Sequence, residues 1–195
     1  DDFLLEKFPT WKFEAHLPTN IPGVAEAITG GIGMPAYTKA VADHFSDIAW
    51  GHYSSSYDGG TGGQTGFYNV MLNPTTSLAE AAVTWPTWWN ASCAWNGVMV
   101  QQAHDTAAAV PSNYRYYIGT GSRHTMYGSD KVYTDTSGGV PTIASWLTSM
   151  LARDGGWTNV ECSSDCGKLL PGDPRPSPLV APFGTSGPDT VITCP

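Results

Sequence analysis

Two residues of this 195-residue sequence have the type and local context needed for acid–base chemistry. Asp58 follows the segment "DIAWGHYSSSY" and precedes the glycine-rich run "GGTGG", and His124 follows "YRYYIGTGSR". A carboxylate that accepts a hydrogen bond from one imidazole nitrogen fixes the tautomer of the ring, so the other nitrogen is able to take a proton from a nucleophile. The pair therefore predicts the Asp and the His of a Ser-His-Asp triad.

The segments before these two residues have the composition of strands. Aromatic and β-branched residues dominate "YRYYIG" at 114–119, and "DIAWGHYSSSYD" at 47–58 ends on the acidic residue. In a parallel α/β sheet, functional residues lie just past the carboxyl ends of the strands. We therefore expect an α/β fold in which Asp58 and His124 lie at one edge of a mostly parallel sheet. Asp before His along the chain is also the order of the α/β-hydrolase triad.

Helical patterns separate and flank these strands. Pro111 ends one long pattern, because proline cannot continue a helix, and Pro141 suits the first turn of another. Ser77 and Glu80 have the spacing of a capping box. The predicted helices cover a short piece at 24–28, then 35–45, a helix starting at 77, a long helix from 91 or 92 to 109, and 141–153.

The composition is that of an exported protein. Only 13% of the residues are charged, against about 25% in an average soluble domain. The net charge is −8 and the nine Lys and Arg residues form no stripe, which argues against a nucleic-acid partner. No stretch reaches the ~18–20 apolar residues of a membrane span. We expect a secreted or periplasmic protein without a membrane partner, whose start "DDFLLEKFPTW" is a mature or cut end.

The four cysteines, Cys93, Cys162, Cys166 and Cys194, predict one or two disulfides. Two disulfides allow three connectivities, and the sequence leaves them open. Cys162 and Cys166 lack the further ligands of a zinc site, so we expect no metal. The region 167–195 holds seven of the fifteen prolines and predicts an irregular tail pinned by Cys194.

A tryptophan cluster supports a second function. The stretch "WPTWWNASCAW" includes Trp85, Trp88 and Trp89, whose rings would either pack in a core or lid or form a platform for sugar rings. The alternative to an enzyme is therefore a noncatalytic carbohydrate-binding protein. Asn90, in "NAS", has the form of a glycosylation acceptor.

Several other residues compete for the roles above. Asp43, Asp47 and Asp105 are alternatives to Asp58, and a histidine at position 124 also suits a bond to a loop carbonyl. The pair His104-Asp105 is expected to face solvent from a helix. The run "GIGMPA", from Gly31, satisfies Gly-x-Gly-x-x-Ala but follows no predicted strand, so we expect no dinucleotide and no other cofactor.

Four stretches together resemble a known family. "DDFLLEKFPTWKFEAHLP", "FYNVML", "YRYYIGTGSRHTMY" and "VPTIASWLTSMLARDGGWTNVEC" are similar to the carboxyl-terminal part of bacterial pectin acetylesterase-like hydrolases, a group that includes the Notum-type carboxylesterases. The resemblance spans about residues 1–162. It implies that 1–166 is the carboxyl-terminal part of one α/β-hydrolase domain, with a Trp-rich insertion at about 74–96 and a tail at 167–195. It also implies that Asp58 and His124 belong to a Ser-Asp-His triad that cleaves carboxylic esters.

The sequence lacks the motif that carries the nucleophilic serine in α/β-hydrolases. No Gly-x-Ser-x-Gly elbow is present: "GTGSR" lacks the second glycine and "GTSGP" lies in the tail. In the family, the elbow and the oxyanion-hole loop lie upstream of the point where this sequence begins. We therefore expect the serine on a separate N-terminal polypeptide of a divided enzyme. A truncated fragment and a lineage that has lost activity are the other interpretations, and the ester substrate stays open between a polysaccharide, a polyester and a small molecule.

Overall fold

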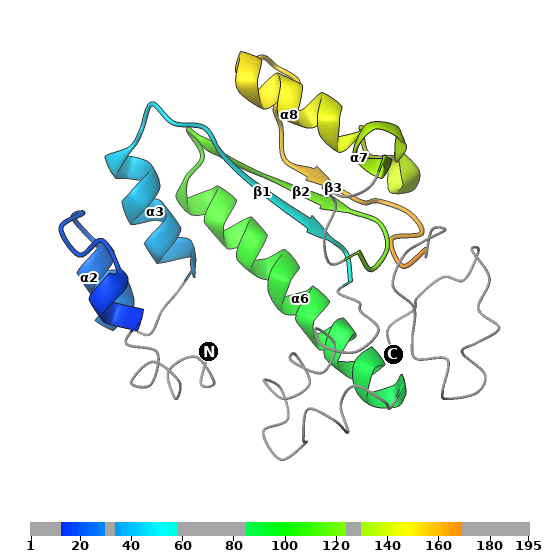
Figure 1. The fold of residues 1–195 in the computed structure, drawn as a ribbon, viewed down its shortest axis with the longest axis horizontal. Coiled ribbons are helices and arrows are strands. Elements are labelled where there is room, and N and C mark those ends of the chain that lie inside the picture. The colour runs from blue at the N-terminus through cyan, green and yellow to red at the C-terminus, as the bar shows by residue number, and fades with distance from the viewer. Residues whose placement is uncertain (1–12, 30–33, 58–84, 124–129, 169–195) are drawn as a thin grey trace. The chain divides into compact units, whose positions relative to one another are not determined.

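The computed structural model describes residues 13–29, 34–57, 85–123 and 130–168. Helices alternate with three strands along these residues, which places them in the α/β class (Figure 1). The elements are η1 (Phe13–His16), α2 (Val24–Thr29), α3 (Met34–His44), β1 (Trp50–Ser55), α6 (Trp85–Ala109), β2 (Tyr114–Gly119), α7 (Lys131–Thr134), η2 (Ser137–Gly139), α8 (Ile143–Ala152) and β3 (Val160–Glu161).

The strands form a sheet of order β1-β2-β3. The Trp50 N–H donates to the Asn113 carbonyl (2.7 Å) at the start of β1, and the Ser56 N–H donates to the Gly119 carbonyl (2.7 Å) past its end. Because the residue numbers of both partners rise together, β1 and β2 run parallel. β2 and β3 are also parallel, with Tyr117 opposite Val160. The described strands thus form a small parallel sheet, as predicted.

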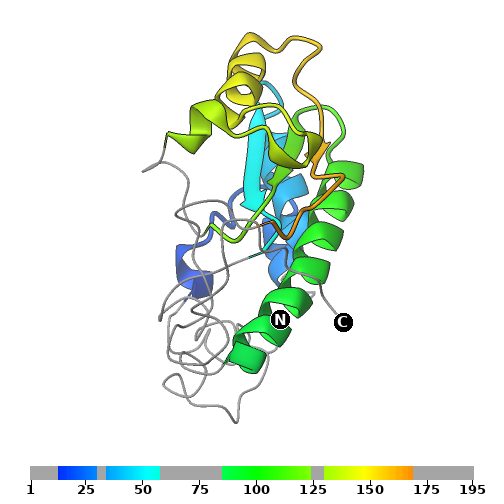
Figure 2. The same ribbon diagram turned by 90° about the vertical axis from the view of Figure 1, so that its right-hand side faces the viewer.

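β2 is the most buried strand because almost every side chain in "YRYYIG" is large and apolar or aromatic. Tyr114, Tyr116, Tyr117 and Ile118 are all buried. The Tyr117 ring packs against Trp146 of α8, with ring centroids 5.7 Å apart, and its hydroxyl donates to the Pro141 carbonyl (2.5 Å). α8 lies alongside the sheet in Figure 2. It therefore covers β2 at Tyr117.

The chain divides into two compact units, and the boundaries between them fall within β1, α6 and β2. The first consists of Asp1–His52 and Gln101–Arg115. In it, α2 packs against α3, and Gly23, at φ +85°, lies where an added Cβ would come 3.3 Å from the Cβ of Ala40. This close approach allows the small side chains of the two helices to be buried, including Val24 and Ala42.

The second unit consists of Tyr53–Val100 and Tyr116–Pro195. Its core includes Ile118, Val140, Ile143 and Trp146. Ile143 and Trp146 lie three residues apart, so they share one face of α8. The Trp146 indole N–H donates to the Thr158 carbonyl (2.9 Å), which satisfies the one polar group of this buried side chain and fixes the approach to β3.

α6 begins earlier than the sequence pattern predicts. We expected a start at 91 or 92, and the helix instead starts at Trp85 with Pro86 in its first turn. Proline is tolerated there because the first N–H groups of a helix have no intrahelical acceptor. Along the second half of the helix, Met99, Ala103 and Thr106 are buried at spacings of four and three, the stripe that faces a core.

The predictions for α2, α3, β1, β2 and α8 are confirmed, within a few residues at their ends. Pro141 is a correction, since it precedes α8 rather than occupying its first turn. Thr142 is the N-cap, and its side-chain oxygen accepts from the Ser145 N–H at 3.1 Å. α7 and β3 were not predicted, because four and two residues are too short to show a periodic pattern. The helix expected from Ser77 lies outside the described residues.

Asn113 provides a test of the first unit. Its side chain is 3% exposed, and its amide nitrogen donates to the carbonyls of Ala42 (3.1 Å), Phe45 (3.4 Å) and Ile48 (3.0 Å), at and after the end of α3. Asn113→Ala should lower the free energy of unfolding by about 1–3 kcal/mol, because buried carbonyls would lose their donor. Asn113→Asp should lower it at least as much, since a carboxylate has no N–H to donate. Urea unfolding measures both, and an Asp variant as stable as the unaltered protein would contradict this role.

Candidate functional site

Asp58 and His124 themselves lie outside the described residues, but the residues directly before them are described. The Ser55 hydroxyl lies 2.8 Å from the Tyr57 carbonyl oxygen and 2.5 Å from the Arg123 carbonyl oxygen. The Tyr57 N–H donates to the Gly121 carbonyl (2.9 Å). The two chain segments that lead to the predicted triad residues are therefore hydrogen-bonded to each other beyond the carboxyl ends of β1 and β2.

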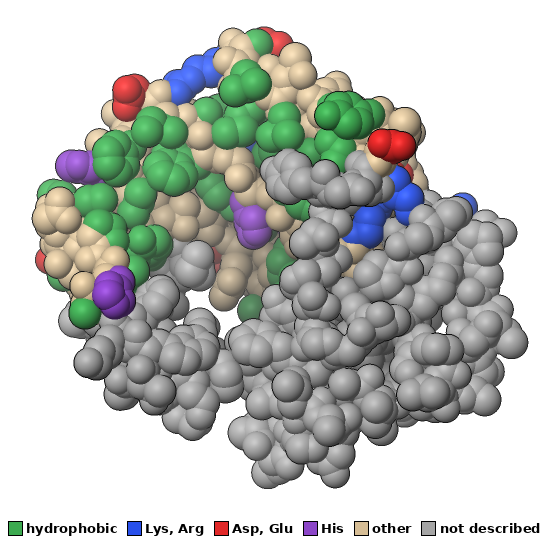
Figure 3. Space-filling view, in the orientation of Figure 1, with side chains coloured by type: hydrophobic (Ala, Val, Ile, Leu, Met, Phe, Trp, Pro, Cys, Tyr) green, Lys and Arg blue, Asp and Glu red, His purple; other side chains and the backbone are tan. Residues whose placement is uncertain are grey.

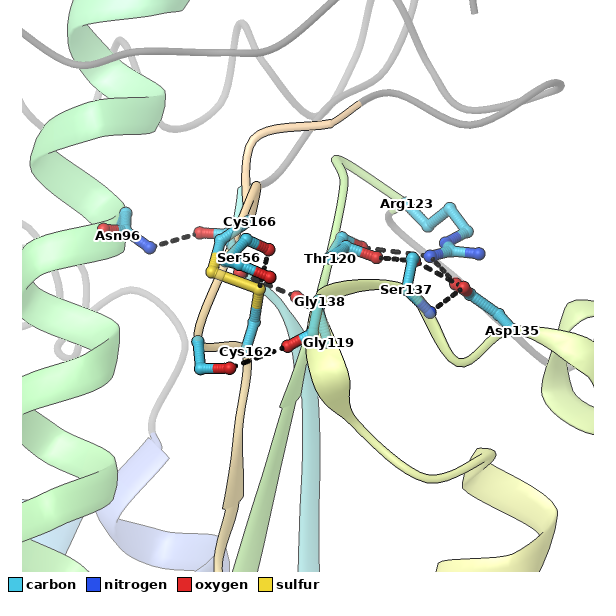
Figure 4. Close-up of a disulfide and its surroundings, with 12 residues drawn as sticks. Ser56, Asn96, Gly119, Thr120, Arg123, Asp135, Ser137, Gly138, Cys162 and Cys166 are labelled. Atoms are coloured by element: carbon cyan, nitrogen blue, oxygen red, sulfur yellow. Dashed lines mark hydrogen bonds and ion pairs between the residues drawn. A yellow bond between two sulfur atoms is a disulfide. The ribbon is translucent and has the colours of Figure 1, made fainter. Parts of the chain in front are cut away.

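Ser56 adds a second set of bonds at this edge of the sheet. Its N–H and its hydroxyl both donate to the Gly119 carbonyl, each at 2.7 Å. Asn96 of α6 donates from its side-chain nitrogen to the Ser56 carbonyl (2.5 Å), as Figure 4 shows. The backbone that precedes position 58 is thus fixed by both the neighbouring strand and a helix.

A buried ion pair holds the segment that precedes His124. Nη2 of Arg123 lies 2.6 Å from Oδ2 of Asp135, and the two side chains are 5% and 11% exposed (Figure 4). The same guanidinium nitrogen, Nη2, also donates to the Thr120 carbonyl (3.0 Å). A buried pair such as this is stable only with further hydrogen bonds to its charged atoms.

Asp135 has those further bonds. The Ser137 N–H (3.0 Å) and hydroxyl (2.5 Å) both donate to Oδ1, and the Ser137 hydroxyl lies 2.5 Å from the Thr120 hydroxyl. Burial alone would raise the pKa of Asp135, but the Ser137 donors, followed by the Arg123 guanidinium, outweigh it and hold that pKa below its ordinary value. The carboxyl group is therefore ionised at neutral pH.

A disulfide supports the same strand end from the other side. Cys162 and Cys166 are bonded to each other, which confirms the prediction of at least one disulfide and gives a pairing that the sequence left open (Figure 4). The Cys162 N–H donates to the Ile118 carbonyl and the Gly121 N–H donates to the Cys166 carbonyl, both at 2.9 Å. Cys93 is also disulfide-bonded, and Cys194 lies outside the described residues. The bridge thus closes a short loop that is hydrogen-bonded to β2 at Cys162 and to Gly121, two residues past β2, at Cys166.

The described residues of this region hold the backbone that leads to positions 58 and 124. They do not include an accessible serine in a motif close to Gly-x-Ser-x-Gly. Ser122, the serine of "GTGSR", has no exposed surface. A substrate would therefore not reach its hydroxyl. Sequence reasoning missed Arg123, Asp135 and Ser137, because a salt bridge between two loop residues leaves no periodic signal. The position of Arg123 next to the predicted histidine was the one available hint.

The alternative carboxylates have other contacts or surroundings. Asp43 pairs with Lys39 one turn away (2.5 Å), and Asp105 accepts from Gln101 at the same spacing (2.8 Å). Asp43, Asp47 and Asp105 are all exposed, and His104 is exposed as predicted. These side chains have the surroundings of solvated surface groups.

The remaining predicted site residues are only partly covered. Trp85, Trp88, Trp89 and Asn90 lie in the first two turns of α6, but their side chains are outside the described part, so the sugar platform and the glycosylation stay predictions. The run from Gly31 follows α2, a helix, and leads into α3. A dinucleotide site would require a strand before the glycines.

Neither a metal cluster nor a membrane span is found in the part of the chain that the structure describes. Within 13–29, 34–57, 85–123 and 130–168, no three His, Cys, Asp or Glu side chains are grouped so as to hold a metal ion. No helix in these ranges is long and apolar enough to cross a membrane. Figure 3 shows hydrophobic side chains on the face that it draws. Among the described residues, Tyr133 and Leu151 are exposed large hydrophobic residues. Exposed hydrophobic residues are common on soluble proteins and define no interface by themselves.

In comparisons with known proteins, no protein-family model matches this chain, and no curated protein or solved structure matches it significantly. The family resemblance of the sequence therefore stays a prediction.

The packing between the disulfide and η2 can be tested at Gly138. This residue has φ +74°, and an added Cβ would collide with the sulfur of Cys162 and come 2.6 Å from Cγ2 of Thr120. Gly138→Ala should destabilise the protein by about 1–3 kcal/mol, from overpacking and left-handed backbone strain. Gly155→Ala is the matched control, because an added Cβ there meets nothing within 4 Å. Equal stability of the two variants in urea unfolding would contradict the packing.

The ionised state of Asp135 predicts a dependence on pH. Because its pKa is lower in the folded state, the stability that its charge provides is present above the ordinary aspartate pKa of about 3.9 and is lost as the pH falls through the lower folded value. The gap in unfolding free energy between the unaltered protein and Asp135→Asn should therefore narrow below about pH 4. Asp130→Asn serves as control, since Asp130 is exposed and makes no side-chain cap bond. A gap that stays constant from neutral to acid pH would refute this assignment.

Proposed function

We propose that this chain provides the Asp and the His of a Ser-His-Asp triad in a secreted carboxylic ester hydrolase with the α/β-hydrolase fold. Asp58 is the orienting carboxylate, and His124 is the general base and then the general acid. The nucleophilic serine lies on a separate N-terminal polypeptide of the same enzyme. The observation that carries the proposal is the contact of one hydroxyl, that of Ser55, with the carbonyls of both Tyr57 and Arg123.

This contact limits the distance between the segment that ends at Tyr57 and the segment that ends at Arg123. Both carbonyl oxygens lie within hydrogen-bond distance of one oxygen atom, so they are no farther apart than the sum of those two distances. Asp58 and His124 are the next residues along their respective segments. Each residue extends a chain by at most ~3.3–3.6 Å, and the proposal joins the two side chains by a carboxylate–imidazole hydrogen bond one residue beyond these contacts.

The position relative to the sheet supports a catalytic role over a structural one. Asp58 follows β1 and His124 follows β2, and the two strands are adjacent and parallel. Ligands and catalytic groups of open α/β sheets lie beyond the carboxyl ends of such strands. A histidine that served only to bind a loop carbonyl would not need an acidic residue at the end of the adjacent strand.

The reaction follows from these roles. His124 removes the proton of the serine hydroxyl as the serine oxygen bonds to the ester carbonyl carbon, and Asp58 stabilises the resulting imidazolium. The tetrahedral intermediate collapses with loss of the alcohol, which takes that proton from His124. Water then attacks the acyl-enzyme with His124 again as base, and the carboxylic acid leaves as the serine recovers its proton.

The pattern of serines supports a second polypeptide. The sequence holds no Gly-x-Ser-x-Gly elbow, and the serine of the nearest motif, Ser122, is buried. An active chain of this type therefore needs a serine from elsewhere. The resemblance to pectin acetylesterase-like hydrolases, in which the elbow lies upstream, supports its placement on an N-terminal piece.

The test is a substitution in the protein purified with all of its polypeptides. His124→Ala should lower kcat for a short aryl ester by about 10²–10⁴, the usual contribution of a general base, and leave the thermal midpoint nearly unchanged. His104→Ala, at an exposed helix position, is the control and should retain full activity. Activity of His124→Ala equal to that of the control would eliminate the assignment.

A fluorophosphonate identifies the serine independently. The proposal predicts that it labels a co-purifying polypeptide other than this chain, and that His124→Ala strongly slows the labelling. A single chain that is inert to the reagent and is retained on polysaccharide columns would instead favour the carbohydrate-binding alternative.

A further inference from the structure

The residue directly before His124 belongs to a closed ring of polar contacts. Arg123 Nη2 donates to the Thr120 carbonyl and to Asp135 Oδ2, Ser137 donates to Asp135 Oδ1, and the Ser137 hydroxyl contacts the Thr120 hydroxyl. We call these four residues, Thr120, Arg123, Asp135 and Ser137, the Asp135 ring. The ring closes on itself at Thr120, so each member is held from two sides (Figure 4).

We propose that Asp135 is a positioning residue for His124, acting through Arg123 and the Asp135 ring. This inference rests on the proposed catalytic role of His124. Asp135 itself touches no reacting atom in the proposal. It holds the end of the segment from Thr120 to Arg123 through its bond with Arg123, and the start of that segment through Ser137. This segment connects β2 to His124.

The geometry favours positioning because of which residues the ring joins. Arg123 is the last residue before His124, and Thr120 is the first residue after β2. A bond between the Arg123 side chain and the Thr120 carbonyl holds this segment in one conformation, and Asp135 holds the guanidinium in that orientation. Without the carboxylate, the guanidinium loses its charged partner and the segment loses one of its restraints.

The surroundings of the ring make it rigid. Thr120 is 1% exposed and Arg123 6% exposed. The intervening Gly121 is bonded to the disulfide loop through the Cys166 carbonyl, and its own carbonyl accepts from Tyr57. The residue before His124 is therefore tied to Asp135, which lies between α7 and η2. The residue before Asp58, Tyr57, is tied to Gly121 in the segment from Thr120 to Arg123.

The energetic scale supports an effect on rate. A misplacement of about 1 Å in a catalytic group costs as much as 10²-fold in rate, even when the change lies outside the reacting atoms. The loss of one partner of a buried ion pair is strongly destabilising, which favours rearrangement of the surrounding loop. The loop that would rearrange here is the one that leads into His124.

The experiment compares three variants in the complete protein. Asp135→Asn keeps the shape and removes the charge, Ser137→Ala removes only the hydroxyl contacts of the ring, and Asp130→Asn removes an exposed charge five residues from Asp135. Rates of aryl-ester hydrolysis are divided by the amount of serine that a fluorophosphonate labels once the labelling has gone to completion, so that neither slow labelling nor unfolded protein affects the comparison. Thermal midpoints are recorded for all three.

We expect Asp135→Asn to lower kcat per labelled serine by about 10- to 100-fold with KM changed less than twofold, because a displaced base impairs chemistry and not binding. Ser137→Ala should lower kcat by a smaller factor, and it decides the question if Asp135→Asn does not fold. Asp130→Asn should match the unaltered protein.

Two results would overturn the inference while the proposed function stands. One is a kcat per labelled serine in both ring variants within twofold of the Asp130→Asn control, which would mean that the ring contributes stability alone. The other is a raised KM with unchanged kcat, which would assign the ring to substrate binding. If the unaltered protein hydrolyses no ester, the proposed function and this inference fail together.

Discussion

The parallel pairing of β1 with β2 is the constraint on which the rest of this structure depends. Ser56 bonds to the Gly119 carbonyl through both its N–H and its hydroxyl, and Tyr57 bonds to Gly121, so the register continues past the ends of the strands. A slip of one residue would turn every side chain of a strand to the opposite face. It would also remove the Ser55 hydroxyl from the Arg123 carbonyl. The register therefore determines which residues that follow β1 come close to which residues that follow β2.

Polar contacts, rather than apolar packing, complete this edge of the sheet. A buried ion pair contributes little net stability, because the removal of two charges from water offsets their attraction. Asp135 accepts two hydrogen bonds from Ser137 in addition to its bond with Arg123, and these bonds restrain its orientation. The Cys162–Cys166 disulfide closes a neighbouring loop, which binds the segment after β2 through the hydrogen bond from the Gly121 N–H to the Cys166 carbonyl. The segment of four residues after β2 is thus held by an ion pair and by hydrogen bonds, one of which comes from the disulfide loop.

The sequence predicted the elements that have a strong local pattern. β2 was found with its exact bounds because "YRYYIG" is a dense run of aromatic residues. α3 followed from its apolar spacing, and α8 from the proline before it and the glycines after it. The start of α6 was missed because Pro86 looks like a helix breaker, although the first turn tolerates it. β3 consists of two residues whose strand state comes from pairing with Tyr117 and Ile118, a tertiary contact that no local pattern encodes. The same reason hid Asp135, whose partner lies twelve residues away. Asp58 and His124 were identified from strand-end position and chain order, and that inference stays a prediction.

The most direct test is the distance between the Asp58 carboxylate and the His124 imidazole in an experimental structure of the protein with all of its polypeptides. The account predicts that a carboxylate oxygen and a ring nitrogen lie within about 2.6–3.2 Å, with the second ring nitrogen facing a serine hydroxyl. Side chains separated beyond hydrogen-bond reach, or directed to different sides of the sheet, would contradict it.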